Sequence, residues 1–200
     1  MSAHAQPRLT PEQYLEIERA ADFKSDYYDG HMYAMSGGSP RHAFIIGNLV
    51  RELGIALKSR PGSVASSDLR LRVGSGTLYT YPDVMVVCGP IQVAARQTDT
   101  LINPTIVAEV LSPSTERYDR GIKWTQYRTI ESLQEYALVS QAEPRVEIFR
   151  RKPEGQWLFV DFAGLDGVCK FDSLDCAVAL SDIYHNISFG DEQPAPDSLL

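Results

Sequence analysis

The sequence has no hydrophobic run long enough to cross a membrane. A membrane-spanning helix needs about 18 or more consecutive apolar residues, and none occurs in the 200 residues. The N-terminal stretch, residues 1–8, is polar and lacks the apolar core of a secretory signal. We therefore expect a cytoplasmic protein with no membrane partner.

Cysteine is also scarce. Cys88, Cys169 and Cys176 form no CxxC pair, and the six residues between the last two match no common zinc spacing. We therefore expect neither a disulfide framework nor a structural zinc site, and we interpret the three residues as free thiols in a reducing compartment.

Positive charge is in deficit, with 19 Lys and Arg residues against 26 Asp and Glu residues and a formal net charge of −7. Avid, non-specific binding to nucleic acid depends on phosphate neutralisation, which this acidic balance disfavours. It does not exclude a local basic rim, because total charge does not describe its distribution. The sequence also lacks GxxxxGK(S/T) and GxSxG motifs, which argues against an NTPase and a serine hydrolase.

The length and composition suit one domain. The chain is 44% hydrophobic and 22% charged, enough to bury a core without disulfides. We expect a single domain over residues 1–200, with a core at about 10–185 and a flexible tail at 188–200.

Local patterns predict a mixed α/β (α+β) fold. Thr10-Pro11 is typical of a helix start, and Asp29-Gly30 predicts a hairpin within residues 24–36. Apolar spacing predicts helices at 41–58 and 116–130, strands at 64–66, 69–73, 79–88, 105–111 and 134–140, and an antiparallel extension at 146–151, 157–162 and 168–171. This order favours a central mixed β-sheet flanked by helices.

Two acidic residues stand in apolar strands. Asp83 follows Pro82 just before an apolar run at 84–88, and Glu109 lies within the β-branched run at 105–111. A buried carboxylate is costly unless it is paired or binds a cation. Mg²⁺ takes one or two carboxylates together with waters and phosphate oxygens, so two such strands could supply half of its ligands. A solvent-facing Glu109, or one paired with an arginine, is an equally good interpretation of the strand alone.

A cation for this site is expected from the helix at 116–130. Leu111 occupies the strand position beside Glu109 on the same face, where many metal nucleases have a lysine. Lys123 shares a helix face with Asp119 and Tyr127 at four-residue spacing and could overhang the carboxylates. The alternative is a plain surface pair between Asp119 and Lys123.

Several segments together resemble the Uma-two family of restriction endonuclease-like proteins, a branch of the PD-(D/E)XK nuclease superfamily. The resemblance runs from about Thr10 to about Ile183. The segments are DYYDGHMYAMSG at 26–37, Arg41-His42, YPDVMV at 81–86, PTIVAEVLSPST at 104–115, then Asp119, Lys123, Tyr127 and Glu135-Tyr136.

The resemblance implies a restriction-endonuclease-like core in which the superfamily lysine has moved onto a helix. It assigns the catalytic roles to Asp83, Glu109 and Lys123. Asp26 stands where relatives usually have Glu, and His31 where they often have Glu, so Asp26 could support a metal only with a shorter reach.

The resulting hypothesis is Mg²⁺-dependent hydrolysis of DNA, with Mn²⁺ as a substitute. Asp83, Glu109 and the backbone carbonyl of Val110 would be metal ligands, and Lys123 would act on the attacking water. Possible supporting residues are Asp26, His42 and Tyr127, although a lone His near a helix start more often caps or packs.

The rival hypothesis is a catalytically silent nuclease fold that binds nucleic acid or protein, and RNA is not excluded as a substrate. We also expect a homodimer, because cutting both strands of a duplex is simplest with two symmetric sites. Trp157, Phe159 and Phe162 are the apolar residues expected at its interface.

Overall fold

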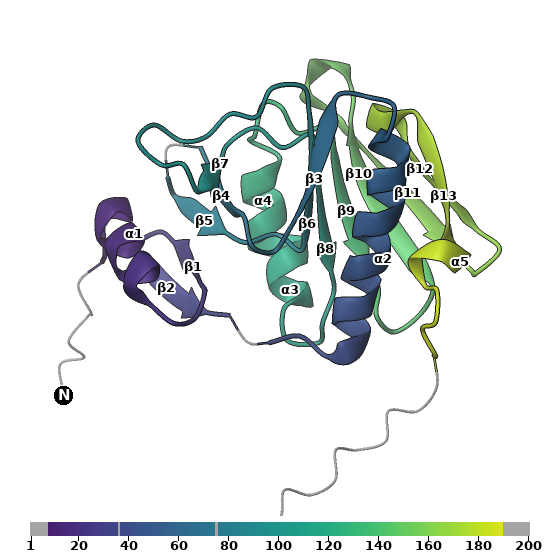
Figure 1. The fold of residues 1–200 in the computed structure, drawn as a ribbon, viewed down its shortest axis with the longest axis horizontal. Coiled ribbons are helices and arrows are strands. Elements are labelled where there is room, and N and C mark those ends of the chain that lie inside the picture. Colours follow the sequence, from purple (N-terminus) through teal and green to yellow (C-terminus); the bar gives the residue numbers. More distant parts are fainter. Residues whose placement is uncertain (1–7, 36, 75, 190–200) are drawn as a thin grey trace, which may run out of the picture.

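The centre of the molecule is a six-stranded mixed sheet with strand order β11-β10-β9-β8-β6-β3 (Figure 1). The computed structural model describes residues 8–35, 37–74 and 76–189. The strands are β3 (Gly62–Ser66), β6 (Val84–Cys88), β8 (Ile106–Val110), β9 (Glu135–Val139), β10 (Arg145–Arg151) and β11 (Trp157–Ala163). Only β8 and β9 pair in parallel within this sheet, and its other pairs are antiparallel. The predicted central mixed sheet is confirmed.

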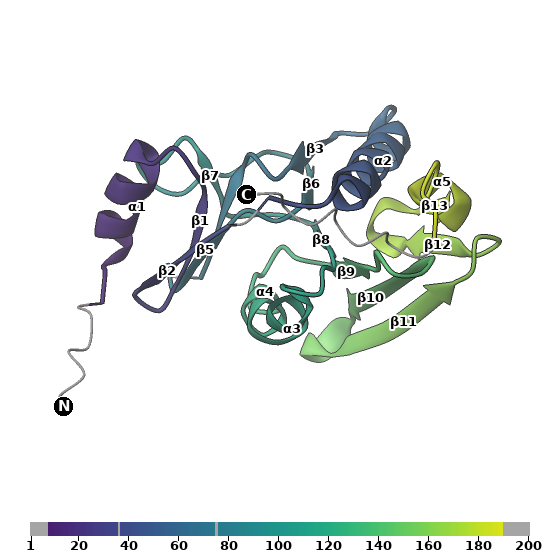
Figure 2. The same cartoon turned by 90° about the horizontal axis from the view of Figure 1, so that it is seen from below.

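Helices cover both faces of this sheet (Figure 2). On one face lies α2 (Pro40–Leu57), which begins at Pro40 behind the N-cap Ser39 and packs its apolar side against alternate residues of β6 and β8. Also on this face lie α5 (Leu180–Ile183) and the two-stranded sheet of β12 (Val168–Phe171) and β13 (Cys176–Ala179). On the other face lie α3 (Glu116–Tyr118), the π-helical turn η1 (Asp119–Lys123) and α4 (Trp124–Tyr127).

The N-terminal elements form a second sheet at one end of the molecule (Figures 1 and 2). Its five strands run in the order β2-β1-β5-β4-β7. They are β1 (Ser25–Tyr28), β2 (His31–Ala34), β4 (Arg70–Val73), β5 (Leu78–Thr80) and β7 (Thr100–Leu101). α1 (Pro11–Ala20) has the predicted start, with Thr10 as its N-cap, and its Tyr14 stacks on Tyr27 of β1.

The prediction of one continuous strand at 79–88 is wrong. Residues 78–80 form β5 in the five-stranded sheet, and residues 84–88 form β6 in the six-stranded sheet. Pro82 has no N–H to donate to a strand ladder, so pairing stops there and the chain passes from one sheet to the other. Asp83 therefore stands at the junction of the two sheets.

Other boundaries also differ from those predicted. The helix expected at 116–130 ends at Tyr127 and contains the π-helical turn η1. β10 and β11 extend the main sheet as expected, whereas β12 leaves it and pairs with β13. β7, β13 and α5 were not predicted, because each has only two to four residues and no periodicity can show in so short a segment.

The remaining expectations concern membrane spans, the C-terminal tail, the cysteines and the number of domains. In the described part of the chain no helix is both long and apolar enough to span a membrane. Residues 190–200 of the expected flexible tail lie outside the described residues. The three cysteines are free thiols, with Cys88 exposed and Cys169 buried. That residues 1–200 form a single domain stays a prediction.

Candidate active site

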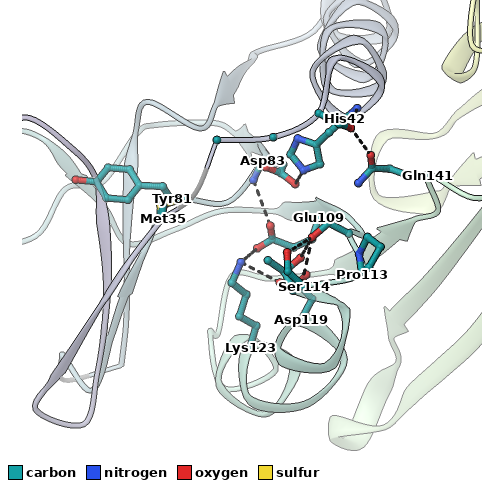
Figure 3. Close-up of a pocket in the computed structure, with 15 residues that line it drawn as sticks. Met35, His42, Tyr81, Asp83, Glu109, Pro113, Ser114, Asp119, Lys123 and Gln141 are labelled. Carbon is teal, nitrogen blue, oxygen red and sulfur yellow. Dashed lines mark hydrogen bonds and ion pairs between the residues drawn. The ribbon is translucent and has the colours of Figure 1, made fainter. Parts of the chain in front are cut away.

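A cavity of about 310 Å³ opens where the start of α2, the ends of β6 and β8 and the α3–η1 segment meet (Figure 3). Asp83, Glu109 and Lys123 all line it, together with His42 and Asp119. The topology explains this gathering. β8 and β9 are parallel, so the chain between them must cross over, and that crossover places α3, η1 and α4 above the face of β8 that carries Glu109.

Asp83 faces Glu109 because of the strand register. β6 and β8 are antiparallel with Val84 opposite Ala108, and one further step places Asp83 opposite Glu109. The backbone N–H of Val110 donates to Asp83 Oδ2 at 2.8 Å, and the backbone N–H of Asp83 makes a long contact of 3.4 Å with Glu109 Oε2. The two carboxylates are thus fixed side by side at the edge of the cavity.

Glu109 is buried, with 3% of its surface exposed. Its Oε1 accepts hydrogen bonds from Lys123 Nζ at 3.0 Å and from the Tyr127 hydroxyl at 2.8 Å. Burial raises the pKa of Glu109 to about 8, and the nearby ammonium of Lys123 opposes that rise. The strand interpretation with a solvent-facing Glu109 is therefore wrong.

Lys123 is held between two carboxylates. Its Nζ lies 3.0 Å from Glu109 Oε1 and 3.0 Å from Asp119 Oδ1, and both acids are buried. Burial alone would lower the pKa of Lys123, but Glu109, Asp119 and Asp26 together raise it well above its usual value. The side chain is therefore an ammonium that points at the site, and the alternative of a plain surface pair with Asp119 is wrong.

Asp26 is placed differently from the other candidates. It lies on β1 of the five-stranded sheet and does not line the cavity. Burial raises the pKa of its carboxyl, and Lys123 acts in the opposite direction. Its Oδ1 is buried and has no hydrogen-bond partner among the described residues. Asp26 therefore influences the site electrostatically, because its carboxylate contributes to the raised pKa of Lys123.

His42 lies in the first turn of α2, with its Nε2 3.2 Å from Asp83 Oδ2. Burial lowers the pKa of His42, but the hydrogen bond to Asp83 and the backbone of Val110 outweigh it, so the net shift is upward. Gly38 makes room for this ring, since a Cβ there would lie 2.6 Å from His42 Nδ1. His42 is therefore packed between Gly38 and Asp83, and its contact with Asp83 favours the protonated ring.

Sequence reasoning did not select several residues that line the cavity. Asp119 was named as a helix neighbour of Lys123 and as part of the family resemblance, but it was given no role at the site. Ser112 was named only within the segment at 104–115, yet its hydroxyl lies 3.0 Å from the Ser114 hydroxyl and 2.9 Å from the Thr115 hydroxyl at the cavity. Gln141, whose side chain donates to the Leu111 carbonyl at 2.6 Å, had no sequence signal at all.

The donor set suits a hard divalent cation that keeps most of its waters. Asp83 uses Oδ2 for its contacts with the Val110 N–H and with His42, so Oδ1 takes part in neither. Within the described part of the chain, Glu109 Oε2 has only the long contact with the Asp83 N–H. No group of three or more His, Cys, Asp or Glu side chains suited to a metal occurs among the described residues. Two carboxylates nevertheless fit Mg²⁺, which completes its shell with water and phosphate oxygens, better than a fully protein-ligated ion.

A family model and two relatives match most of this chain. The family model of Uma2, described as "putative restriction endonuclease", matches residues 11–179. An uncharacterized protein of Synechocystis sp. is 35% identical over 183 residues, which cover 92% of this chain and 95% of that protein. A second uncharacterized Synechocystis protein is 34% identical over 163 residues, 82% of this chain and 92% of its own length.

One solved structure has the same fold. It is described as "a putative nuclease belonging to DUF820" from Anabaena variabilis, and it covers 88% of this chain and 97% of its own. The TM-score is 0.71 at 19% sequence identity. At that identity the likeness shows a shared fold.

Proposed function

This chain belongs to the Uma2 family, and from that premise we propose that it is a metal-dependent endonuclease that hydrolyses phosphodiester bonds in DNA. One observation carries the proposal. Two carboxylates, Asp83 just before β6 and Glu109 within β8, meet a buried ammonium, Lys123, at one cavity. A purely structural ion pair needs no second carboxylate beside it, and a second buried acid raises the cost of the arrangement.

Asp83 and Glu109 would hold Mg²⁺, or Mn²⁺ in its place, with the backbone carbonyl of Val110 as a further ligand. When bound, the ion would lower the pKa of a coordinated water and offset negative charge on the scissile phosphate. The protein supplies the fixed geometry, because the Val110 N–H and the Tyr127 hydroxyl already orient the two carboxylates.

Lys123 would donate to the attacking water or to a non-bridging phosphate oxygen. It is positioned before substrate arrives, since Asp119 and Glu109 hold its Nζ from two sides. A preorganised charge that needs no rearrangement during the reaction stabilises the transition state most effectively. His42 and the hydroxyls of Ser112 and Ser114 lie at the same cavity and would contact the phosphate.

Cleavage assays test the proposal directly. Plasmid, single-stranded and flapped DNA would be incubated with the protein in Mg²⁺, in Mn²⁺ and in EDTA. We expect metal-dependent cleavage that Asp83→Ala and Glu109→Ala abolish. Lys123→Ala should lose about 100- to 1,000-fold in kcat while Mn²⁺ still binds, because the lysine does not contact the ion. Exposed Glu154→Ala, in a turn distant from the cavity, is the matched control.

A double variant tests whether Asp83 and Glu109 act at one shared site or at two separate ones. Asp83→Ala/Glu109→Ala should be scarcely worse than either single variant, because both residues serve one reaction. Cleavage that survives Asp83→Ala would mean a different site or a contaminating nuclease. No cleavage of DNA or RNA, together with metal-independent binding of DNA or protein, would favour the silent interaction module instead.

A homodimer is the assembly that we propose for cutting both strands. Leu158 and Phe159 are 46% and 48% exposed on β11, which is an edge strand of the six-stranded sheet. The expected interface residues Trp157 and Phe162 are partly buried against the cores instead. An exposed apolar edge strand is open to pairing with a second copy.

A further inference from the structure

A second hollow, of about 440 Å³, adjoins the catalytic cavity. The two share part of their lining, including Met35, His42 and Asp83, which are labelled in Figure 3. Ligand pockets typically measure about 300–1,000 Å³. A substrate whose scissile phosphate lies at Asp83 would therefore extend into this hollow.

The hollow has an apolar floor and an exposed aromatic side chain. Phe23, in the bend after α1, is 61% exposed and lines it together with Met35 and Ile46. The hollow thus lies where three parts of the chain meet. Phe23 comes from the bend after α1, Met35 from the end of β2 and Ile46 from α2. An aromatic ring that remains this exposed beside a cavity is available to stack on a flat ligand.

Two cations near the hollows are already engaged by acids. Lys24, at the rim, pairs with Asp68 and donates to the Ser67 carbonyl. Arg120, which lines a different pocket beside the catalytic cavity, pairs with Glu116 and Glu147. Because Lys24 and Arg120 are paired with acids, neither neutralises a phosphate without giving up its partner. The exposed Phe23 ring offers a contact that does not depend on phosphate charge.

We propose that this hollow, which we call the Phe23 hollow, receives an unpaired base next to the scissile phosphate, so that the substrate is DNA with an unpaired strand. The inference rests on the proposed nuclease function. A base within a duplex has both faces stacked, whereas an unpaired base offers a free face to Phe23. Base–aromatic stacking tolerates any sequence and depends less on salt than phosphate contacts do.

Binding without turnover tests this inference. An oligodeoxynucleotide that carries one 2-aminopurine in a single-stranded gap would be titrated with the full chain in Ca²⁺. We expect quenching of its fluorescence on binding, and Phe23→Ala should weaken binding about tenfold, which corresponds to about 1.4 kcal/mol of lost stacking. Phe44→Ala is the matched control, because Phe44 is 62% exposed on α2 and lines a different hollow.

The outcomes separate the inference from the nuclease proposal. Gap-specific, Phe23-dependent binding without any cleavage in Mg²⁺ or Mn²⁺ would support the hollow and overturn the nuclease. Cleavage of intact duplex at an equal rate by the wild type and Phe23→Ala would support the nuclease and overturn the hollow. Equal loss in Phe23→Ala and Phe44→Ala, or tighter Phe23-dependent binding to RNA of the same sequence, would also overturn the inference.

Discussion

At the scale of single residues, Asp119 and Glu109 both form ion pairs with Lys123 but have different proposed roles. Glu109 is also a proposed metal ligand, whereas Asp119 is proposed only to position the lysine. Asp119→Asn should keep the side chain's size and remove its charge. We expect a loss of about 10- to 100-fold in kcat with little change in KM, because the ammonium loses one of the charges that position it.

Steady-state kinetics and Mn²⁺ binding measure this effect of Asp119→Asn. Glu116→Gln is the control on the same helical segment, since Glu116 pairs with the exposed Arg120 and does not line the catalytic cavity. A drop in Mn²⁺ affinity as large as that of Asp83→Ala would show that Asp119 is a metal ligand instead of a positioning residue.

Among single residues, Glu109 and Lys123 were predicted for different reasons. Glu109 is a carboxylate in an apolar strand, a costly position without a partner. Lys123 shares a helix face with Asp119 and Tyr127 at four-residue spacing. The structure supplies the partners, with Lys123 Nζ 3.0 Å from Glu109. Gln141 could not be predicted, because an ordinary polar residue after a strand carries no local signal.

At the scale of elements, the ion pairs of Asp99 tie α1 to the five-stranded sheet. Asp99 lies in the turn before β7 and accepts from Arg19 Nε at 3.1 Å and Arg19 Nη2 at 3.0 Å. The hydrogen bonds from Arg19 lower its pKa from 3.8 to about 2. Because the folded protein favours the ionised form, this stabilisation is present above pH 3.8 and is lost as the pH falls toward about 2.

Asp99→Asn should therefore lower the free energy of unfolding at neutral pH by about 1 kcal/mol, a value reduced by solvent screening because the Asp99 side chain is 42% exposed. Urea unfolding at several pH values measures the difference. The two proteins should converge between about pH 4 and 2. A difference that stays constant over this range would mean that the side chain acts by packing and not by charge.

Elements of the site were predictable where the signal was local. The strand at 106–110 is β-branched and buried on both faces, as expected. The helix after Ser112 forms, but π-helical turn η1 occupies residues 119–123, and the expected face of Asp119, Lys123 and Tyr127 still points at Glu109. The widened turn could not be predicted, because it depends on contacts with strands far away in the sequence.

The junction at Pro82 shows the limit of local reasoning. Periodicity joined residues 79–88 into one strand, yet the chain enters a different sheet after Asp83. Strand partners are chosen by long-range packing, which a single sequence does not reveal. Asp26 follows the same rule, since its interaction with Lys123 exists only because β1 pairs beside β5, which leads into that junction.

At the scale of the whole molecule, the site carries more acid than base. Asp83, Glu109 and Asp119 line the cavity with Lys123 and His42, and buried Asp26 also acts on Lys123. A ligand that binds only the folded state stabilises it by mass action, by about 2.7 kcal/mol at a concentration of 100 Kd. Mg²⁺ or Mn²⁺ should therefore raise the melting temperature, and EDTA should reverse the rise.

Differential scanning fluorimetry with increasing Mn²⁺ measures this stabilisation. The rise should vanish in Asp83→Ala and persist in Lys123→Ala, since the lysine is not expected to contact the ion. An equal rise in the wild type and Asp83→Ala would place the bound metal elsewhere on the molecule.

The last prediction concerns assembly of two copies through β11. Its neighbour β10 occupies one edge of the strand, and among the described residues no strand pairs with the other edge. Leu158 and Phe159 are both exposed there, so pairing with a second copy would cover apolar surface and unpaired backbone together. Light scattering at micromolar concentration should give twice the 22.3 kDa mass of the chain.

Phe159→Lys should shift this protein toward the monomer, because a charge buried at a symmetric interface appears twice and repels itself. Leu165→Lys is the matched control, since Leu165 is 50% exposed in the loop after β11 and not in the strand. Equal dissociation by both substitutions would move the interface away from β11. A wild-type protein that is monomeric at high micromolar concentration would contradict the proposed dimer. Cleavage of both strands would then require two separate encounters with the DNA.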